Sequence, residues 1–354
     1  MDIVPTSQEA AALDRPPLLI LDQLETFLDD HGLGDGPISA SRIGVGGGSN
    51  FTFLLERGSE RLVLRRPPRP PLPPSAHDMV REARLQLALV PQGIRLPEIV
   101  AVCDDESILG VDFYVMRFLD GHVVTDELPP GLETPAARRR LGLDLVDTLA
   151  EIHAADVSTP ELAAFTRSGS YLERQVQRFA QLWELNRTRE IPAVVEVGTE
   201  LAARLPEPLP ATVVHGDYRL GNMMLSLDDP SKIAAVLDWE MGAIGDPRAD
   251  LGYLIATYTE PGGAQSPLGS SPVTAGDGFP TRAELAARYV ERTGRDIEPL
   301  AWFEALALWK AAVFCEAIYG RFTRGELGSE DTRAAFFEQG VPLLAETALT
   351  ALNR

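Results

Sequence analysis

Apolar positions change their spacing along the chain, and each spacing predicts a type of element. Short or alternating apolar segments at 38–45, 51–56 and 61–66 predict three strands, because successive strand side chains face opposite sides. Before them, apolar residues recur every three or four positions at 18–31, which predicts a helix that packs on the strands. A fourth strand is predicted at 111–121. The N-terminal part of the chain is therefore expected to be rich in strands.

Helical spacing dominates the rest of the chain. At 135–156 a stripe of leucines ends in Ile152, which predicts a helix in the core of this part. His153 follows the stripe, and a buried, hydrogen-bonded histidine is a better interpretation than a catalytic one. The proline-dense segment 67–74 predicts an extended connector, and the Gly-, Ser- and Pro-rich segment 260–280 a flexible loop. Further helices are predicted at 170–188, 193–204, 250–259, 281–293, 299–324 and 330–352.

Polar side chains suited to metal binding follow two short apolar runs. The run Thr212–Val214 leads through His215 and Gly216 into Asp217, Asn222 closes the loop that follows, and the run 233–237 ends in Asp238. Such runs are typical of buried strands, so the three oxygen-bearing side chains are expected to share one space. Mg²⁺ prefers oxygen ligands of this kind together with substrate phosphates. A buried hairpin with turn-forming Asp and Asn is the structural alternative.

A glycine-rich segment, GVGGGSN at 44–50, separates the first two predicted strands. Glycines let backbone N–H groups approach phosphate oxygens closely. The segment is not a Walker A loop, because no Gly-Lys-Ser/Thr follows, and an ordinary hairpin turn is the alternative. The candidate phosphate-binding residues are Gly46, Gly47, Gly48, Ser49 and Asn50.

The order of these motifs resembles the aminoglycoside phosphotransferase family, which has a protein-kinase-like fold. The family pattern H-G-D-x-x-x-x-N is present with Asp217 and Asn222, a strand ends in Asp238, and G-D-P-x-x-D-L follows at 245–251. The resemblance covers about residues 37–350. It implies an α+β, two-lobed fold with a small antiparallel-sheet N-lobe and a larger, mostly helical C-lobe. The implied domains are an N-terminal helix packing on the N-lobe at 1–36, a nucleotide-binding N-lobe at 37–119, and a catalytic and acceptor-binding C-lobe at 120–354.

The resemblance also implies residues that hold the nucleotide. Kinase-like folds place a lysine on the third strand, where it contacts the phosphates and pairs with a glutamate on the next helix. Arg65 occupies this position, and its fork keeps the positive charge. Glu82 is its expected partner, on a helix capped by Ser75 or Asp78, although an exposed helix acid is the alternative.

The strand at 111–121 corresponds to the hinge of the resembled fold. Backbone groups of Arg117, Phe118 and Leu119 are expected to hydrogen-bond the adenine edge, with Met116 behind the base. Plain core packing of Met116 would look the same in the sequence.

The resemblance implies an ATP-dependent phosphotransferase that moves the γ-phosphate to a hydroxyl of a small molecule. Asp217 would orient or deprotonate the acceptor, and Asn222 and Asp238 would bind Mg²⁺. Several segments resemble a subgroup of kinase domains related to those attached to some acyl-CoA dehydrogenases, so a hydroxyacyl-CoA or another hydroxylated metabolite is an expected acceptor. The replacement of lysine by Arg65 motivates the alternative, a nucleotide-binding pseudokinase that acts as a regulatory module.

Composition narrows the possible partners. The 354 residues are 45% apolar and 24% charged, as in an ordinary globular protein. The net charge of −20 argues against nucleic-acid binding, which needs a basic surface. No apolar run reaches the roughly 18 residues of a membrane span. Two distant cysteines, Cys103 and Cys315, and an acidic N-terminus without a signal-peptide layout predict a cytoplasmic protein, while its oligomeric state stays open.

The predicted helix at 299–324 bears on the charge of the acceptor. Its aromatic and basic residues favour an apolar or anionic acceptor over a polycationic aminoglycoside if part of it lines the acceptor site, whereas core packing is the alternative. These residues are Trp302, Trp309, Lys310, Tyr319, Arg321 and Arg324.

Overall fold

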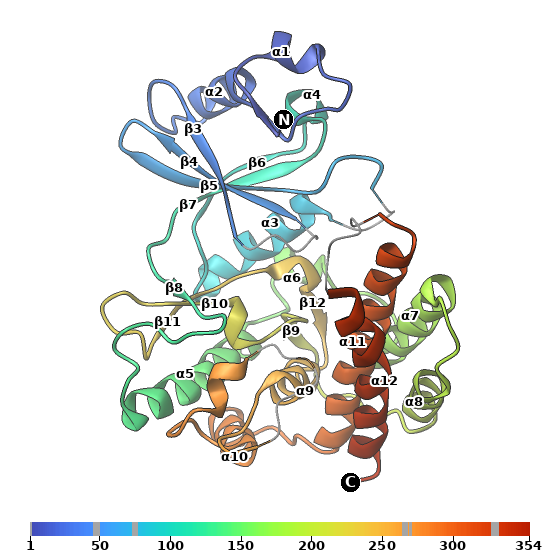
Figure 1. The fold of residues 1–354 in the computed structure, drawn as a ribbon. Coiled ribbons are helices and arrows are strands. Elements are labelled where there is room, and N and C mark those ends of the chain that lie inside the picture. The colour runs from blue at the N-terminus through green and yellow to red at the C-terminus, as the bar shows by residue number, and fades with distance from the viewer. Residues whose placement is uncertain (1, 45–49, 73–76, 264–267, 269–270, 327–332) are drawn as a thin grey trace. The chain divides into compact units, whose positions relative to one another are not determined.

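The computed structural model describes residues 2–44, 50–72, 77–263, 268, 271–326 and 333–354. The chain forms two compact units, Met1–Asp120 and Gly121–Arg354. Each unit has a hydrophobic core of its own. The combination of an antiparallel sheet with many helices confirms the predicted α+β class (Figure 1).

The first unit is built on a five-stranded antiparallel sheet in the order β3-β4-β5-β7-β6 (Figure 1). Its strands are β3 Ser39–Ile43, β4 Phe51–Arg57, β5 Glu60–Arg66, β6 Ile99–Cys103 and β7 Phe113–Arg117. The other elements are β1 Ile3–Val4, α1 Ser7–Ala11, β2 Leu19–Ile20, α2 Leu21–Asp30, α3 Met79–Leu89, the 3-10 helix η1 Val90–Gln92, and α4 Glu106–Leu109. Of these elements, β1, α1, β2, η1, β6 and α4 are not predicted from the sequence.

Alternation along the central strands separates the two faces of this sheet. Arg65 of β5 pairs with Tyr114 of β7, and both side chains lie on the face covered by α3. Their neighbours Leu64 and Val115, also a cross-strand pair, face the core that α2 completes with Phe27. The sheet therefore presents Arg65 to α3 and its apolar neighbours to α2.

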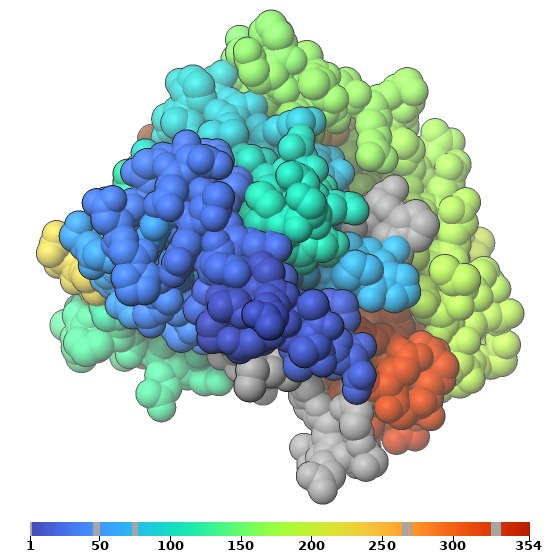
Figure 2. All heavy atoms as spheres, turned by 90° about the horizontal axis from the view of Figure 1, so that it is seen from above, coloured from blue at the N-terminus to red at the C-terminus, as the bar shows by residue number. Residues whose placement is uncertain are grey.

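The predicted helix at 18–31 begins later than expected. The N–H groups of Leu18 and Leu19 donate to the Asp2 carbonyl at 2.7 and 3.0 Å, so this segment forms the short strand β2 parallel to β1. Helix α2 then begins at Leu21. Figure 2 shows its residues (dark blue) beside α4 (teal), which it contacts.

The second unit contains two small antiparallel sheets and most of the helices. Its strands are β8 His122–Val123, β9 Thr212–Val214, β10 Met223–Leu225, β11 Ile233–Val236 and β12 Ala243–Gly245. Its helices are α5 Pro135–His153, α6 Pro160–Ala163, α7 Tyr171–Asn186, α8 Pro192–Ala203, α9 Arg248–Thr257, α10 Arg282–Thr293, α11 Leu300–Thr323 and α12 Arg333–Leu352. Three 3-10 turns are η2 Leu220–Asn222, η3 Trp239–Met241 and η4 Pro272–Ala275. The loop predicted at 260–280 falls partly outside the described residues.

Helix α5 supports the strands of the second unit. β10 lies between β11 and β8, and β9 pairs with β12. The Tyr218 hydroxyl donates to the Leu145 carbonyl of α5 at 2.7 Å, and the Asp144 carboxylate of α5 accepts the Ile233 N–H at 2.8 Å. Both hydrogen bonds are buried, so they fix the loop after β9 and the start of β11 on one helix.

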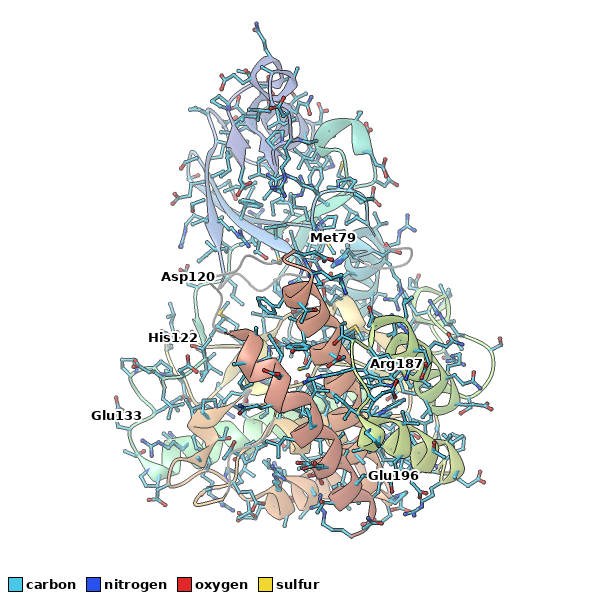
Figure 3. The ribbon with its side chains drawn as sticks, turned by 45° about the vertical axis from the view of Figure 1, so that its right-hand side comes forward. Met79, Asp120, His122, Glu133, Arg187 and Glu196 are labelled. Carbon is cyan, nitrogen blue, oxygen red and sulfur yellow. The ribbon has the colours of Figure 1, made fainter. Side chains whose placement is uncertain are left out.

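Helices α7, α8, α11 and α12 pack together and enclose the core of the second unit. Figure 3 shows α11 and α12 (salmon) beside α7 and α8 (yellow-green), where Arg187 and Glu196 are labelled. The Trp309 indole of α11 donates to the Val194 carbonyl of α8 at 2.8 Å. In the described part of the chain, no helix has the length and apolar character needed to cross a membrane.

Candidate functional site

The loop after β9 is held in place by one carboxylate. Asp250 of α9 accepts the N–H groups of His215 and Gly216 at 2.6 and 2.7 Å. Gly216 has φ of 87°, and a Cβ there would lie 2.8 Å from the Met241 Cβ, so the turn requires glycine. The loop therefore leaves the strand with a fixed backbone and places Asp217 just after it.

Asp250 is fully buried and has further partners. His153 Nε2 lies 3.3 Å from its carboxylate, and His153 Nδ1 lies 2.7 Å from the Tyr289 hydroxyl. Burial acts to raise the pKa of Asp250, but the hydrogen bond from His153, the electrostatic effects of His153 and His215 and the Gly216 N–H outweigh it and lower that pKa. His153 is thus a buried, hydrogen-bonded residue, as predicted.

Asn222 orients Asp217. The Asn222 amide nitrogen donates to the Asp217 carbonyl and to Asp217 Oδ2, both at 2.8 Å. Because both bonds use the NH₂ group, the amide oxygen of this buried side chain is turned away from Asp217. That oxygen is the atom of Asn222 that could ligate a hard cation.

Asp238 is brought next to Asn222 by the backbone. The Leu237 N–H donates to the Asn222 carbonyl at 2.8 Å, and the Leu237 carbonyl accepts from His215 Nε2 at 2.9 Å. His215 Nδ1 in turn accepts the Asp217 N–H at 3.2 Å, so its proton is on Nε2. Asp238 itself has φ of 64° and ψ of 65°, the left-handed conformation that is costly for a residue other than glycine and is found at functional sites.

The donor set suits a magnesium ion that is shared with substrate phosphates. Among the described residues, no group of three or more His, Cys, Asp or Glu could hold a metal ion by itself. Asn222 and Asp238 instead offer one amide oxygen and one carboxylate on adjacent strand ends. Mg²⁺ commonly takes one or two carboxylates and completes its shell with phosphates and water.

Within the described residues, one oxygen of Asp217 makes no hydrogen bond of normal geometry. Asp217 Oδ1 is buried, and Arg219 Nε approaches it only to 3.5 Å. Tyr253 of α9 lies close by: burial first, and then the charge of Asp217 and a hydrogen bond to its side chain, raise the pKa of the Tyr253 hydroxyl well above the usual value. Sequence reasoning missed Arg219 and Tyr253, although Tyr253 follows Asp250 by three positions and so shares its side of the helix.

In the first unit, the structure brings Arg65 and Glu82 together. Arg65 Nε lies 3.4 Å from Glu82 Oε1, which also accepts the Tyr114 hydroxyl at 3.0 Å. Asp78 is the N-cap of α3, since its side chain accepts the Arg81 N–H, and the other predicted cap, Ser75, lies outside the described residues. Helix α3 therefore places Glu82 beside Arg65, on the face of the sheet that α3 covers.

Two backbone N–H groups of the predicted hinge already donate to carbonyls of the first unit. The Arg117 N–H donates to the Glu98 carbonyl at 2.8 Å and the Phe118 N–H to the Arg61 carbonyl at 3.0 Å. In the backbone contacts described, the Leu119 N–H is not used in this way.

Two further predicted positions lie beside these elements in the first unit. Met116 packs beside Met79 and Tyr114 on the α3 face. The Asn50 amide oxygen lies 2.9 Å from His77 Nδ1, just before α3. The predicted phosphate-binding residues Gly46, Gly47, Gly48 and Ser49 lie outside the described residues.

Comparison with known proteins decides the family. The model of the phosphotransferase enzyme family matches residues 40–303. The chain belongs to this family. Acyl-CoA dehydrogenase family member 11 of Rattus norvegicus is 33% identical over 94% of this chain, although the chain spans only 43% of that relative. The predicted resemblance, including the acyl-CoA dehydrogenase-related subgroup, is confirmed.

Solved structures of the family share the fold. A Ralstonia eutropha protein provisionally described as an aminoglycoside phosphotransferase superposes with a TM-score of 0.78 at 28% identity, over 94% of this chain and 98% of that one. A thermostable aminoglycoside phosphotransferase solved with AMP-PNP and hygromycin B has a TM-score of 0.60 at 16% identity, over 92% of this chain and 98% of that one. The kinase-like phosphotransferase fold expected from the sequence is thereby confirmed.

Proposed function

We propose that the protein transfers the γ-phosphate of ATP to a hydroxyl group of a small molecule. The observation that carries the proposal is the partly exposed Asp217 carboxylate, which Asn222 holds through Oδ2 while Oδ1 makes no hydrogen bond of normal geometry within the described residues. A hydroxyl is the natural donor to such an oxygen. The acceptor oxygen would attack the γ-phosphorus as the bond to the leaving ADP oxygen breaks, and its proton would pass to Asp217.

Mg²⁺ is the proposed metal, with Asn222 and Asp238 as its protein ligands. When bound, such an ion neutralises negative charge that develops on the phosphates during transfer. The chain's own contribution is rigidity, because the Leu237 N–H ties the two ligand residues together and His215 ties them to the Asp217 loop. A rigid arrangement avoids reorganisation during the reaction.

The first unit is the proposed nucleotide-binding part, and the second unit the catalytic and acceptor-binding part. Arg65 would contact the phosphates while Glu82 holds it, and the Leu119 N–H would face the adenine. The glycine-rich residues 46–49 and Asn50 would cradle the phosphates. Nucleotide use also fits the related phosphotransferase solved with AMP-PNP.

The proposed acceptor is a hydroxyacyl-CoA or another hydroxylated metabolite. The matching region of an acyl-CoA dehydrogenase family member supports this choice over an aminoglycoside. A pseudokinase is the weaker proposal, because a purely regulatory module would need neither the Asn222-oriented carboxylate nor the strained backbone of Asp238.

The decisive experiment measures ADP formation by the purified chain with ATP and Mg²⁺ against a panel of acceptors. The panel contains a hydroxyacyl-CoA, choline, kanamycin and a matched acyl-CoA that lacks the hydroxyl. We expect turnover with the hydroxylated thioester and none with its matched control. Binding of ATP without turnover of any acceptor would favour the pseudokinase, whereas efficient phosphorylation of kanamycin would contradict the proposed acceptor alone.

A further inference from the structure

Tyr114 of β7 makes a shorter contact with Glu82 than Arg65 does. The Tyr114 hydroxyl donates to Glu82 Oε1 at 3.0 Å, whereas Arg65 Nε lies 3.4 Å from the same oxygen. N–H···O hydrogen bonds are usually about 2.7–3.2 Å long, so the Arg65 contact is an ion pair beyond that range. The position of Glu82 Oε1 is therefore set mainly by a tyrosine that the proposed function does not yet use.

Strand register and helix spacing bring these side chains together. Tyr114 and Arg65 lie directly opposite each other on β7 and β5, so their side chains share one face of the sheet. Helix α3, which begins at the labelled Met79 in Figure 3, covers this face. Gln86 follows Glu82 by one turn of α3, and its Nε2 donates to the Tyr114 hydroxyl at 3.4 Å. The hydroxyl therefore joins two consecutive turns of the helix that faces Arg65.

The contact between Tyr114 and Glu82 is buried. Tyr114, Glu82 and Gln86 are 2%, 1% and 3% exposed. Burial first, and then the Glu82 charge, raise the pKa of Tyr114 well above its usual value, so the hydroxyl keeps its proton and remains a donor. Low local polarity strengthens such a hydrogen bond and makes its loss costly. The apolar residues packed around Tyr114 are Met79, Ala83, Ile99, Val102 and Met116.

The nitrogen that meets Glu82 exists in arginine but not in lysine. Nε is the first nitrogen along the Arg65 side chain, and the two terminal nitrogens lie beyond it. A lysine has a carbon at this point and carries its charge on one terminal nitrogen. An arginine can thus meet a glutamate through Nε and an anion through its terminal nitrogens, whereas a lysine would divide one ammonium group between the two.

We propose that Tyr114 is a positioning residue for the nucleotide phosphates: it fixes Glu82 so that Glu82 holds Arg65 at Nε, which turns the terminal nitrogens of Arg65 toward the phosphates. This inference rests on the proposed function, because it takes Arg65 as a phosphate contact. Tyr114 touches neither the nucleotide nor the acceptor in this arrangement and acts only through Glu82. The tyrosine thereby helps an arginine to serve at a strand position where kinase-like folds use a lysine.

Calorimetric titrations of the full chain and of Tyr114→Phe with ATP and with adenosine test this proposal. The variant removes one oxygen atom and keeps the ring in its apolar surroundings. Because Arg65 would contact the phosphates and not the base, the Kd of ATP with Mg²⁺ should rise about fivefold, as for partial loss of a hydrogen bond to a charged group. The Kd of adenosine should stay unchanged. Unchanged ATP affinity, or equal weakening of ATP and adenosine, would overturn the proposal.

Tyr258→Phe is the matched control for the loss of a buried hydroxyl. Tyr258 of the second unit is 1% exposed, and its hydroxyl donates to the Pro280 carbonyl at 2.8 Å. The control should lower the unfolding midpoint about as much as Tyr114→Phe does and leave the ATP affinity unchanged. An equal loss of ATP affinity in the control would show that any small loss of stability weakens ATP binding, and this result would also overturn the proposal.

A double-mutant cycle tests whether Tyr114 acts through Glu82. Glu82→Gln removes the charge that both Tyr114 and Arg65 meet, so adding Tyr114→Phe to it should change the ATP affinity by less than about twofold. The full loss in that background would show that Tyr114 acts independently of Glu82 and would contradict the proposal. Turnover by a Tyr114→Phe variant with wild-type ATP affinity would refute this inference alone. Weakened ATP binding in Tyr114→Phe, with no acceptor phosphorylated by the wild type, would refute the proposed phosphotransfer alone.

Discussion

Asp217 and Asp250 are two aspartates of the same unit with opposite surroundings. Asp250 is fully buried, and its two oxygens accept the N–H groups of His215 and Gly216. Asp217 is 25% exposed. Asn222 holds its Oδ2, whereas among the described residues its Oδ1 has only the more distant Arg219 Nε at 3.5 Å. A carboxylate with all its partners in the chain stabilises the fold, whereas one with an open position can receive a proton from a substrate.

The largest expected effect is the loss of turnover when Asp217 is replaced. Asp217→Asn should reduce turnover by about 10²–10⁴-fold, because the amide cannot accept the hydroxyl proton. ATP binding and the unfolding midpoint should stay near those of the wild type. Single-turnover ADP formation and an ATP titration would measure both. Asp228→Asn, the same change at an exposed position, is the control. Unchanged turnover of the folded Asp217 variant would remove Asp217 from its proposed role.

The next effect should appear in stability. Asp250→Asn leaves one of two buried N–H groups facing an NH₂ group, which should cost about 3 kcal/mol of unfolding free energy. The folded pKa of Asp250 lies below the usual 3.8, so the stability it provides is present at neutral pH and is lost as the pH falls through that folded value. The difference between wild type and variant should therefore be constant from pH 7 to 5 and shrink below 3.8, as urea titrations would show. A variant as stable as the wild type at pH 7 would contradict the anchoring role.

The sequence predicted the position and role of Asp217 better than those of Asp250, which anchors the loop before it. Apolar runs locate β9 and β11, and the motif spacing places Asp217 and Asp238 after them, with Asn222 between. Asp250 was recognised only as part of a motif, because its hydrogen bonds join residues 34 and 35 positions apart.

Other features depend on tertiary partners that no local pattern reveals. The Arg117 N–H is occupied by the Glu98 carbonyl across the sheet, and the Leu237 N–H, just before the left-handed Asp238, by the Asn222 carbonyl. Short-range apolar spacing carries no information about such pairs.

A smaller effect concerns the metal. Asp238→Ala should abolish the tightening of ATP binding by Mg²⁺, and Asn222→Ala should weaken it less because an uncharged amide binds a cation more weakly. Since alanine is also strained at a φ of 64°, Asp238→Asn is the control that tolerates this backbone. ATP titrations with and without Mg²⁺ measure the effect. Full magnesium dependence in Asp238→Ala would exclude Asp238 as a ligand.

The smallest effect is expected in the first unit, where Arg65 and Glu82 form an ion pair. Like Asp250, and unlike Asp217, Glu82 has its charged partner within the chain. If Arg65 also contacts the phosphates, charge matters more than fork geometry, so Arg65→Lys should keep activity within about tenfold and Arg65→Ala should keep little. Arg61→Ala, an exposed arginine on the same strand, is the matched control. The KM for ATP should rise in both Arg65 variants and not in the control. Arg65→Ala with a lowered unfolding midpoint but an unchanged KM for ATP would assign the pair to the fold alone and leave the phosphates to other groups.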